Sequence, residues 1–396
     1  MLRIAWRMLA ADRAKFFGLL FGIAFTSFLV TFAAAFFCGF MTQGFSLISE
    51  NGEADVWVMD PAVDSVEQTI NLPDSALARV RGVAGVRMAV PLALGTVEVR
   101  FPNGRFQTFQ VIGVDDATLA GAPAVAGLSL AGLRRHGLVV VDPGGTDGKL
   151  ETPVSKADQW PSDGVHLSVP TRQLEAGDEL LANEQLLRVL ARSEGLPRFP
   201  PRPLIYATLS NVARILPAER HRVTFILVGA APGVAARELG ARIELRTGLR
   251  ARSSDDFKAD TVHWYLINSE DVGDIGAMLI LAMTMGFGVT GIMLYMFTYE
   301  NQKQYAVLKA LGAPPRTLLG MVAAQAAACA VLGTGIGLGI CGVVGALIVP
   351  LGFPFRMMWF TPLAGILGVV LVSLTAAAIS ARPVLKLQPG VVFAGR

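Results

Sequence analysis

Four long stretches of the chain are almost free of charged residues, and the segments between them are polar. They cover residues 16–41, 274–298, 317–349 and 358–381. A helix needs about 20 consecutive apolar residues to cross the hydrocarbon core of a bilayer, so each stretch is long enough. The pattern predicts four transmembrane helices. Because the third stretch is overlong, we expect it to tilt or to end near Pro350, with residues 350–357 as a short extracytoplasmic turn.

The segment between the first two spans, residues 42–273, has the patterns of a folded polar domain. Val56–Met59 predicts a strand, and Val97, Val99 and Phe101 alternate with polar neighbours before an Asn103-Gly104 turn, which predicts a β-hairpin. Later in the domain, alternation over residues 223–227 predicts a further strand, and residues 233–246 predict a helix. The chain is therefore expected to be an α-helical membrane protein with four transmembrane helices and a large α+β extracytoplasmic domain inserted between helices 1 and 2.

Residues of about 119–203 are looser in composition than the rest of the polar domain. They include the Pro- and Gly-rich runs "DPGGTDGK" and "RFPPRP". Such clusters indicate either long loops or a second subdomain inserted in the first.

The distribution of cations predicts the orientation of the spans. The N-terminal flank, the segment between spans two and three (residues 299–316) and the tail (residues 382–396) together carry ten Lys and Arg residues against the acids Asp12 and Glu300. The turn between spans three and four has only Arg356. Cytoplasmic segments are enriched in Lys and Arg, so both termini are expected in the cytoplasm and the large domain outside it, in the periplasm of a bacterial inner membrane.

The N-terminal flank has more than one interpretation. Residues 1–15 place Leu2, Trp6 and Leu9 on one helical face among arginines, as in an interfacial helix, although a simple positively charged flank has the same composition. A cleavable signal ending near Ala33–Ala35 is an alternative to the first span. We favour an uncleaved helix because the apolar run continues to Phe40. A lipoprotein cysteine at Cys38 is disfavoured by the bulky Phe37 before it.

Composition excludes several classes of function. Only 16% of the residues are charged and the net charge is +3, without a basic stripe for nucleic acid. The cysteines lie in apolar runs, the four histidines are scattered without metal-ligand spacing, and no nucleophile elbow is present. "PGGTDGKL" lacks the first Gly and the final Ser or Thr of a phosphate loop. We therefore expect no enzyme activity, metal or cofactor on this chain, and any energy that it uses would come from another subunit; the family resemblance described below implies ATP and Mg²⁺ on a partner ATPase.

Glycines inside the spans predict close helix packing. Residues 286–291 and 337–342 match the G-x-G-x-x-G spacing of dinucleotide sites, but both lie within apolar spans, where small residues let helices approach each other. The predicted packing face on span three consists of Gly333, Gly335, Gly337 and Gly339. Apart from Asp274 at the start of the second, the spans contain no Asp, Glu, Lys, Arg or His, which argues against ion-coupled transport through them.

The segment between spans two and three, "TYENQKQYAVLKALGAPPRTLLG", predicts a short rigid helix. Tyr305 and Leu308 share one face, Val307 and Leu311 form an adjoining ridge, and Lys309 is left for solvent or a partner. Gly312 suits a left-handed C-terminal cap, and Pro314-Pro315 prevent continuation of the helix. A plain interhelical loop is the alternative.

These residues resemble a known family. "EnqkqYAVLKALGAPPRTLL" is similar to the coupling motif of MacB/FtsX-type ABC transporter permeases, and "LRIAWRMLAADRAKFFGLLFGIA" resembles their N-terminal elbow and first span. "VIGVDD", "PLIYATL" and "ISARPVLKLQPGVVF" also fit, and "ADVWVMDPAV" resembles the DevC-like members. The polar Gln302-Lys303-Gln304 departs from the more basic lead-in of many members.

The resemblance implies a dimer of such chains on a cytoplasmic ABC ATPase dimer. The coupling residues would be Tyr305, Val307, Leu308, Lys309, Leu311 and Gly312. ATP-driven closure would move the external domains by mechanotransmission and export a hydrophobic or amphipathic substrate, with a periplasmic adaptor and an outer-membrane channel. The alternatives within the family are a lipoprotein-releasing permease and an FtsX-like signalling subunit that activates a periplasmic partner.

Overall fold

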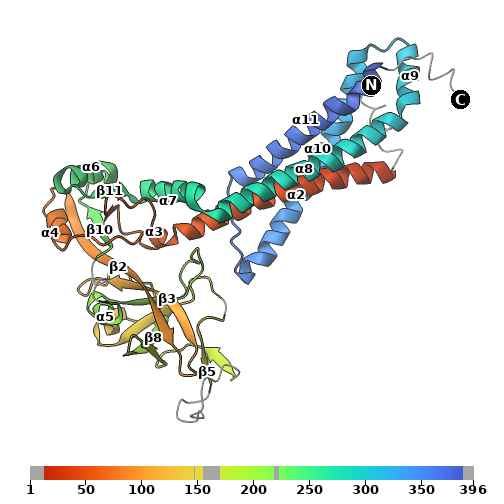
Figure 1. Cartoon of the computed structure of the whole chain (residues 1–396). Coiled ribbons are helices and arrows are strands. Elements are labelled where there is room, and N and C mark those ends of the chain that lie inside the picture. Colours follow the sequence, from red (N-terminus) through yellow and green to blue (C-terminus); the bar gives the residue numbers. More distant parts are fainter. Residues whose placement is uncertain (1–12, 147, 155–169, 218–222, 387–396) are drawn as a thin grey trace. The chain divides into compact units, whose positions relative to one another are not determined.

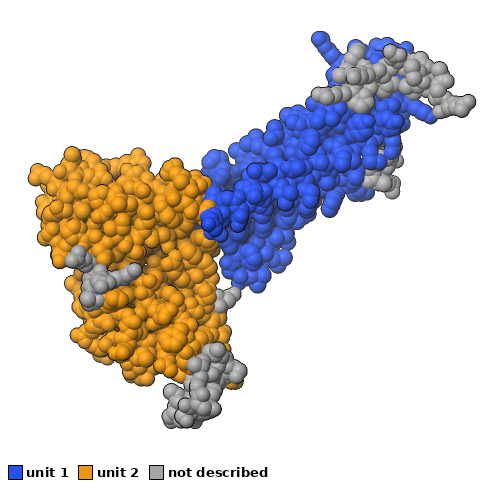
Figure 2. All heavy atoms as spheres, viewed as in Figure 1, with its two compact units in different colours: residues 1–40, 270–396 blue, residues 41–269 orange. Residues whose placement is uncertain are grey.

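The computed structural model of the protein describes residues 13–146, 148–154, 170–217 and 223–386. The chain divides into two compact units, one made of residues 1–40 and 270–396 and the other of residues 41–269 (Figures 1 and 2). The interfacial helix expected at residues 1–15 and most of the expected tail lie outside the described residues.

The first unit consists of helices. These are α2 (Arg13–Gly44), whose last turn belongs to the second unit, α8 (Glu270–Glu300), α9 (Gln302–Ala310), α10 (Pro315–Ile348), the 3₁₀ turn η4 (Val349–Leu351) and α11 (Phe360–Lys386). The four long helices are long and apolar enough to cross a membrane, as the hydropathy pattern predicted. In Figure 1 they run side by side.

Helix α2 is the most enclosed of the four. In its most apolar window 56% of the residues are buried, against 22% in α8, 28% in α10 and 39% in α11. Backbone positions on three neighbouring helices come close to it: a Cβ at Gly286 of α8 would lie 2.3 Å from Thr26, and one at Gly365 of α11 would meet Thr31. Small residues thus let α2 contact α8, α10 and α11 at short range.

Only two of the four glycines predicted to pack on α10 make this close approach. A Cβ at Gly333 would lie 2.6 Å from Ile23, and one at Gly337 would lie 2.4 Å from the Ala24 carbonyl oxygen, whereas Gly335 and Gly339 face open space. Within the single chain, Gly333 and Gly337 are therefore the members of the predicted face that pack against α2. Residues four apart share a helix face, but residues two apart point about 200° away from each other, so alternate glycines cannot all contact one neighbour.

The second unit is a mixed α+β domain. Its helices are α3 (Ser46–Glu50), α4 (Ala76–Arg81), the 3₁₀ helix η1 (Leu130–Arg134), α5 (Leu209–Ile215), α6 (Ala236–Thr247) and α7 (Ser254–Asn268). Its strands are β1 (Val56–Met59), β2 (Val86–Arg100), β3 (Phe106–Val114), β4 (Leu138–Asp142), β5 (Glu151–Pro153), β6 (Thr171–Gln173), β7 (Glu179–Ala182), β8 (Gln185–Arg192), β9 (Leu204–Thr208), β10 (Phe225–Ala230) and β11 (Arg250–Ser253).

One lobe of this domain is an antiparallel sheet in the order β11-β1-β10-β2. The side chains of β1 alternate between its two faces: Val56 and Val58 pack with α4 and α6, while Trp57 and Met59 join a core that includes Phe257 of α7. The strand predicted from the alternation over residues 223–227 is β10, which is buried on both faces because it is a central strand of this sheet.

The other lobe is a small closed barrel. Strand β2 continues past Leu92 and pairs with β3, and the order β2-β3-β9-β4-β8-β7 returns to β2 through the pairing of Val99 with Ala182. The hairpin predicted around Asn103-Gly104 is formed by β2 and β3 and belongs to this barrel.

The sequence placed the start of a second subdomain at about residue 119, and the strand pairing corrects this. Strands β4, β7 and β8 come from the segment 119–203, but β7 pairs with β2 and β4 pairs with β9, and both of these partners lie outside the segment. The barrel therefore begins in the middle of β2, and one long strand is shared by both lobes. Pairings between distant strands are not visible in local composition.

We predict that Gly337→Leu destabilises the helical unit, because any side chain there collides with the Ala24 carbonyl oxygen and with Cβ of Ser27 at 2.6 Å. Forced overpacking of this kind costs about 1 to 3 kcal/mol. Thermal unfolding of the detergent-purified chain should show a lower midpoint. Gly339→Leu is the matched control, since it places the same side chain in open space on the same helix. Equal effects of the two substitutions would contradict the packing assignment.

Candidate functional site

Helix α9 is a short helix between two long ones, and it begins immediately after α8. Asn301 separates α8 from α9, and its carbonyl oxygen accepts the first helical hydrogen bonds, from the Gln304 and Tyr305 amides, each at 3.1 Å. The polar residues at this point interrupt the apolar run of α8, so the chain leaves the span here and turns.

The C-terminal end of α9 is closed by a Schellman motif. The Gly312 amide donates to the Lys309 carbonyl oxygen at 3.1 Å, and the Ala313 amide donates to that of Leu308 at 3.0 Å. Gly312 has φ +89°, a left-handed conformation that favours glycine. Pro314 then precedes α10, with Pro315 in its first turn. The cap expected from the sequence is thus present, and it fixes the turn between α9 and α10.

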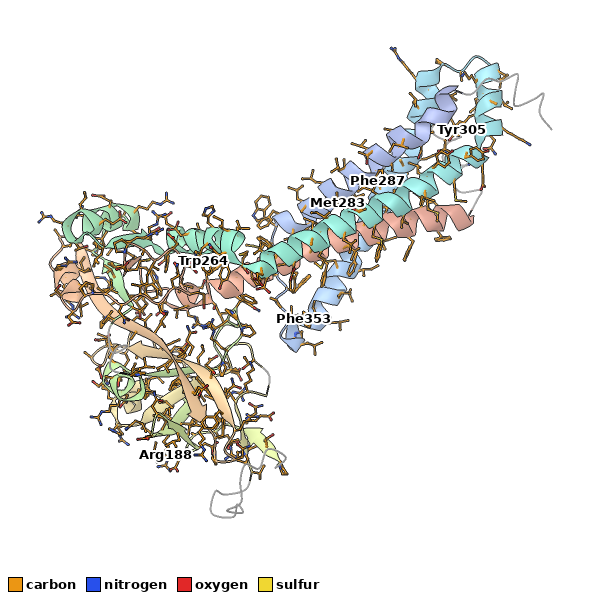
Figure 3. The ribbon with its side chains drawn as sticks, in the orientation of Figure 1. Arg188, Trp264, Met283, Phe287, Tyr305 and Phe353 are labelled. Carbon is orange, nitrogen blue, oxygen red and sulfur yellow. The ribbon has the colours of Figure 1, made fainter. Side chains whose placement is uncertain are left out.

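Tyr305 anchors α9 to α10. Its side chain is fully buried, and its hydroxyl donates to Gln325 Oε1 at 3.1 Å (Figure 3). The ring packs with Leu318 and Val322 of α10, and Leu308 and Ala313 complete this cluster. Burial raises the pKa of the Tyr305 hydroxyl to about 12, so it remains a neutral donor at physiological pH. Burying an aromatic ring of this size contributes about 2 kcal/mol, which holds α9 in place.

The opposite face of α9 is exposed and partly apolar. Val307 is 43% exposed and Leu311 is 79% exposed, and Ala310 lies between them in sequence and is also exposed. Val307 and Leu311 are four residues apart and share one helix face, which extends to the exposed Gln304. An apolar ridge on a rigid helix is the geometry by which one protein docks into a groove of another.

The structure divides the six predicted coupling residues into two groups. Val307, Leu311 and Gly312 are exposed and available to a partner. Tyr305 is not, because it faces α10, and its assignment as a residue that contacts a partner is wrong. Leu308 is half-buried in the same cluster, and Lys309 is also half-buried. The sequence spacing predicted which residues share a face of α9, but it did not predict which of these faces packs against α10.

Two features of this site were not predicted. Tyr295 and Tyr299, on the last turns of α8, are stacked with ring centroids 6.1 Å apart and are 43% and 57% exposed. Their i, i+4 spacing on a helix was the available signal. The second feature is Gln325. A side-chain amide inside an apolar span indicates that a hydrogen-bonding partner is present, but the sequence does not say which residue that partner is.

No metal centre accompanies this site. Over the described part of the chain, no group of three or more His, Cys, Asp or Glu side chains is arranged to hold a metal ion. His166 and His221 lie outside the described residues.

Comparisons of sequence connect the helical unit with known permeases. The family described as FtsX-like permease C-terminal matches residues 276–389, which include α9, α10, α11 and most of α8. Uncharacterized ABC transporter permeases of Mycobacterium bovis and Mycobacterium tuberculosis are 27% identical over 128 residues, which is 31% of this chain and 35% of theirs. The chain thus spans about a third of the length of these relatives.

Comparisons of structure concern the polar domain. The periplasmic region of MacB from Actinobacillus actinomycetemcomitans aligns with 54% of this chain and 96% of its own length, at 12% identity and a TM-score of 0.36. The extracellular domain of the transporter YknZ from Gram-positive bacteria aligns with 50% of this chain and 99% of its own length, at 10% identity and a TM-score of 0.31. Likenesses this weak carry no argument, whereas the match over residues 276–389 shows that the helical unit is similar to the C-terminal part of FtsX-like permeases.

Proposed function

We propose that this chain is the permease subunit of an ATP-driven ABC exporter and that it is moved by a separate cytoplasmic ATPase. The observation that carries the proposal is the construction of α9. One face is locked to α10 by Tyr305, and the other presents the exposed ridge of Val307 and Leu311. A helix held this firmly passes a displacement on to the spans instead of absorbing it.

Transmission would follow the two long helices joined to α9. Helix α10 is connected through the Schellman turn and the buried Tyr305–Gln325 hydrogen bond. Helix α8 is continuous over the 31 residues from Glu270 to Glu300, and it follows α7 after Ser269. A movement of α9 would therefore tilt both spans, and α8 would carry it toward the polar domain, which is mechanotransmission.

The proposed cargo is hydrophobic or amphipathic and is taken from the periplasm or the outer leaflet. Apart from Asp274 at the start of the second, the spans contain no Asp, Glu, Lys, Arg or His, so charged cargo would find no partners between them. In mechanotransmission the cargo need not pass between the helices, because the work is done by the external domain.

The proposed assembly has two copies of this chain on an ABC ATPase dimer that binds ATP and Mg²⁺, in the inner membrane with both termini cytoplasmic. The relatives named as ABC transporter permeases support the ATPase partner. A periplasmic adaptor and an outer-membrane channel complete the export pathway. A lipoprotein-releasing permease or a signalling subunit would use α9 in the same way. Purification of the chain from native membranes distinguishes these cases, because each predicts a different set of co-purifying proteins.

We predict that Leu311→Asp weakens ATPase docking at least tenfold. Leu311 is 79% exposed, so the substitution leaves the fold intact, but it puts a charge where an apolar contact of about 2 kcal/mol would form. The measurement is the amount of ABC ATPase recovered with the affinity-tagged chain from native membranes, together with ATP turnover of the complex.

The matched control for this experiment is Leu245→Asp, because Leu245 of α6 is 88% exposed on a helix of the polar domain. It should leave ATPase recovery unchanged. If the Leu311→Asp chain recovered the ATPase with full ATP turnover, α9 would not be the docking element.

A second prediction concerns the lock between α9 and α10. Tyr305→Phe removes the hydroxyl that donates to Gln325 and leaves a buried acceptor without this donor, which costs about 1 to 3 kcal/mol. Hydrogen–deuterium exchange of the α9 amides should accelerate about tenfold. Tyr299→Phe is the control, because that ring is 57% exposed. Unchanged exchange in the Tyr305→Phe chain would show that the hydrogen bond does not hold α9.

A further inference from the structure

The polar domain contains a cleft of about 640 Å³ that the proposed coupling mechanism does not use. Its walls come from both lobes: the segment after α3, strands β2, β9 and β10, and two loops. The lining residues that matter here are Met88, Val90, Leu227, Glu50, Glu53 and Glu194. The volume is within the range of about 300 to 1,000 Å³ that is typical of small-molecule sites.

The floor of the cleft is apolar. Met88 and Val90 of β2 and Leu227 of β10 contribute aliphatic side chains, and residues 119–124 add Leu, Ala and Pro side chains on one wall. Val90 and Leu227 are buried, whereas Met88 is half-buried. The apolar surface that a ligand could cover therefore belongs mainly to Met88 and to Leu119, which are half-buried. Covering such a surface with an apolar molecule is favourable.

The wall formed by residues 118–124 is held in shape by hydrogen bonds. Arg134 donates from Nε to the Asp116 carbonyl oxygen at 2.8 Å and from Nη2 to that of Ala117 at 2.7 Å. Asp115 accepts from the Thr118 amide and hydroxyl at 2.8 and 2.9 Å. The cleft is therefore formed before any ligand arrives, which reduces the entropic cost of binding.

The charged groups around the cleft are acidic. Glu50 is held by an ion pair with Arg198 and by the Leu196 amide at 2.7 Å, and burial raises the pKa of its carboxyl while Arg198 opposes that shift. Glu53 and Glu194 are exposed, and neither pairs with a cation among the residues that the structure describes. No Lys or Arg from the described part of the chain lines the cleft.

We propose that this cleft binds lipophilic cations, meaning molecules with an apolar body and one positive group. The apolar part would cover Met88 and Leu119, and the cation would lie near the exposed carboxylates of Glu53 and Glu194. An anionic amphiphile would be repelled by the same carboxylates. This inference rests on the proposed export function insofar as it names a class of cargo, but its test uses the full chain without ATPase or ATP, so the two can fail separately.

The test uses a thiol introduced at the cleft by Ala124→Cys, because Ala124 is exposed and lines it. The polar domain has no cysteine of its own, and Cys38, Cys329 and Cys341 are buried in the spans. The rate of maleimide alkylation at this position is followed by mass spectrometry of the detergent-purified full chain. The probes are tetraphenylphosphonium and tetraphenylborate, which have nearly the same size and shape but opposite charge.

Tetraphenylphosphonium at about ten times its Kd should slow alkylation of the Ala124→Cys thiol about tenfold, and tetraphenylborate should not. Adding Glu53→Gln and Glu194→Gln should raise the Kd about tenfold, because each exposed charge pair contributes a few-fold to affinity. Two controls should behave differently: Glu179→Gln, at an exposed acid on β7, should leave the Kd unchanged, and a thiol introduced by Ala176→Cys, outside the cleft, should not be protected.

Three results would overturn the proposal. Equal protection by both ions would mean that the carboxylates do not select the charge. An unchanged Kd for tetraphenylphosphonium after the double glutamine substitution would mean that binding does not depend on Glu53 and Glu194. No protection at all, or equal protection at the Ala176→Cys position, would mean that the cleft is not a binding site for this class of molecule.

Discussion

Close contact between α2 and its three neighbours is the constraint on which the helical unit depends. Lipid tails are as apolar as leucine side chains, so the spans gain little from the hydrophobic effect when they associate and must approach closely enough for van der Waals contact. Gly286, Gly337 and Gly365, on three different helices, bring backbone to within contact distance of α2. The outward faces of α8 and α10, by contrast, remain rich in exposed apolar side chains, as expected for surfaces that meet lipid.

The proposed role of α9 in coupling requires a rigid helix, and two contacts make it rigid. The Schellman motif at Gly312 fixes its backbone, and the burial of Tyr305 fixes its orientation on α10. The exposed ridge of Val307 and Leu311 then projects from a defined position. A flexible loop with the same residues could bind a partner, but it would not pass movement to the spans.

The polar domain is organised around a different constraint, the length of β2. This strand of 15 residues pairs with β10 over its first half and with β3 over its second, so both lobes share one continuous backbone. A displacement of one lobe is thereby transmitted to the other. The cleft uses residues from both, and binding there would be sensitive to any movement between them.

Local patterns in the sequence were sufficient for several features. The four spans follow from charge-free runs, the β2–β3 hairpin from alternation around Asn103-Gly104, and the cap of α9 from Gly312 followed by two prolines. Each depends on residues near one another in the chain, where backbone preference and periodicity act directly. The same patterns placed Tyr305 and Leu308 on one face of α9, but they could not say what that face contacts.

Features that depend on contacts between distant residues were decided only by the tertiary structure. Tyr305 meets Gln325 because α10 folds back on α9, and Gly337 but not Gly339 meets α2 because of how α10 is rotated about its axis. The extent of the barrel and the cleft depend on strands that pair across much of the chain. The sequence by itself determined the four spans, strand β1, the β2–β3 hairpin and the cap of α9, but not strands β4, β7 and β8. Long-range packing set which faces of these elements contact each other. In an apolar helix, the residues on the side that packs on a neighbour have the same hydropathy as those on the other sides, so the sequence does not identify that side.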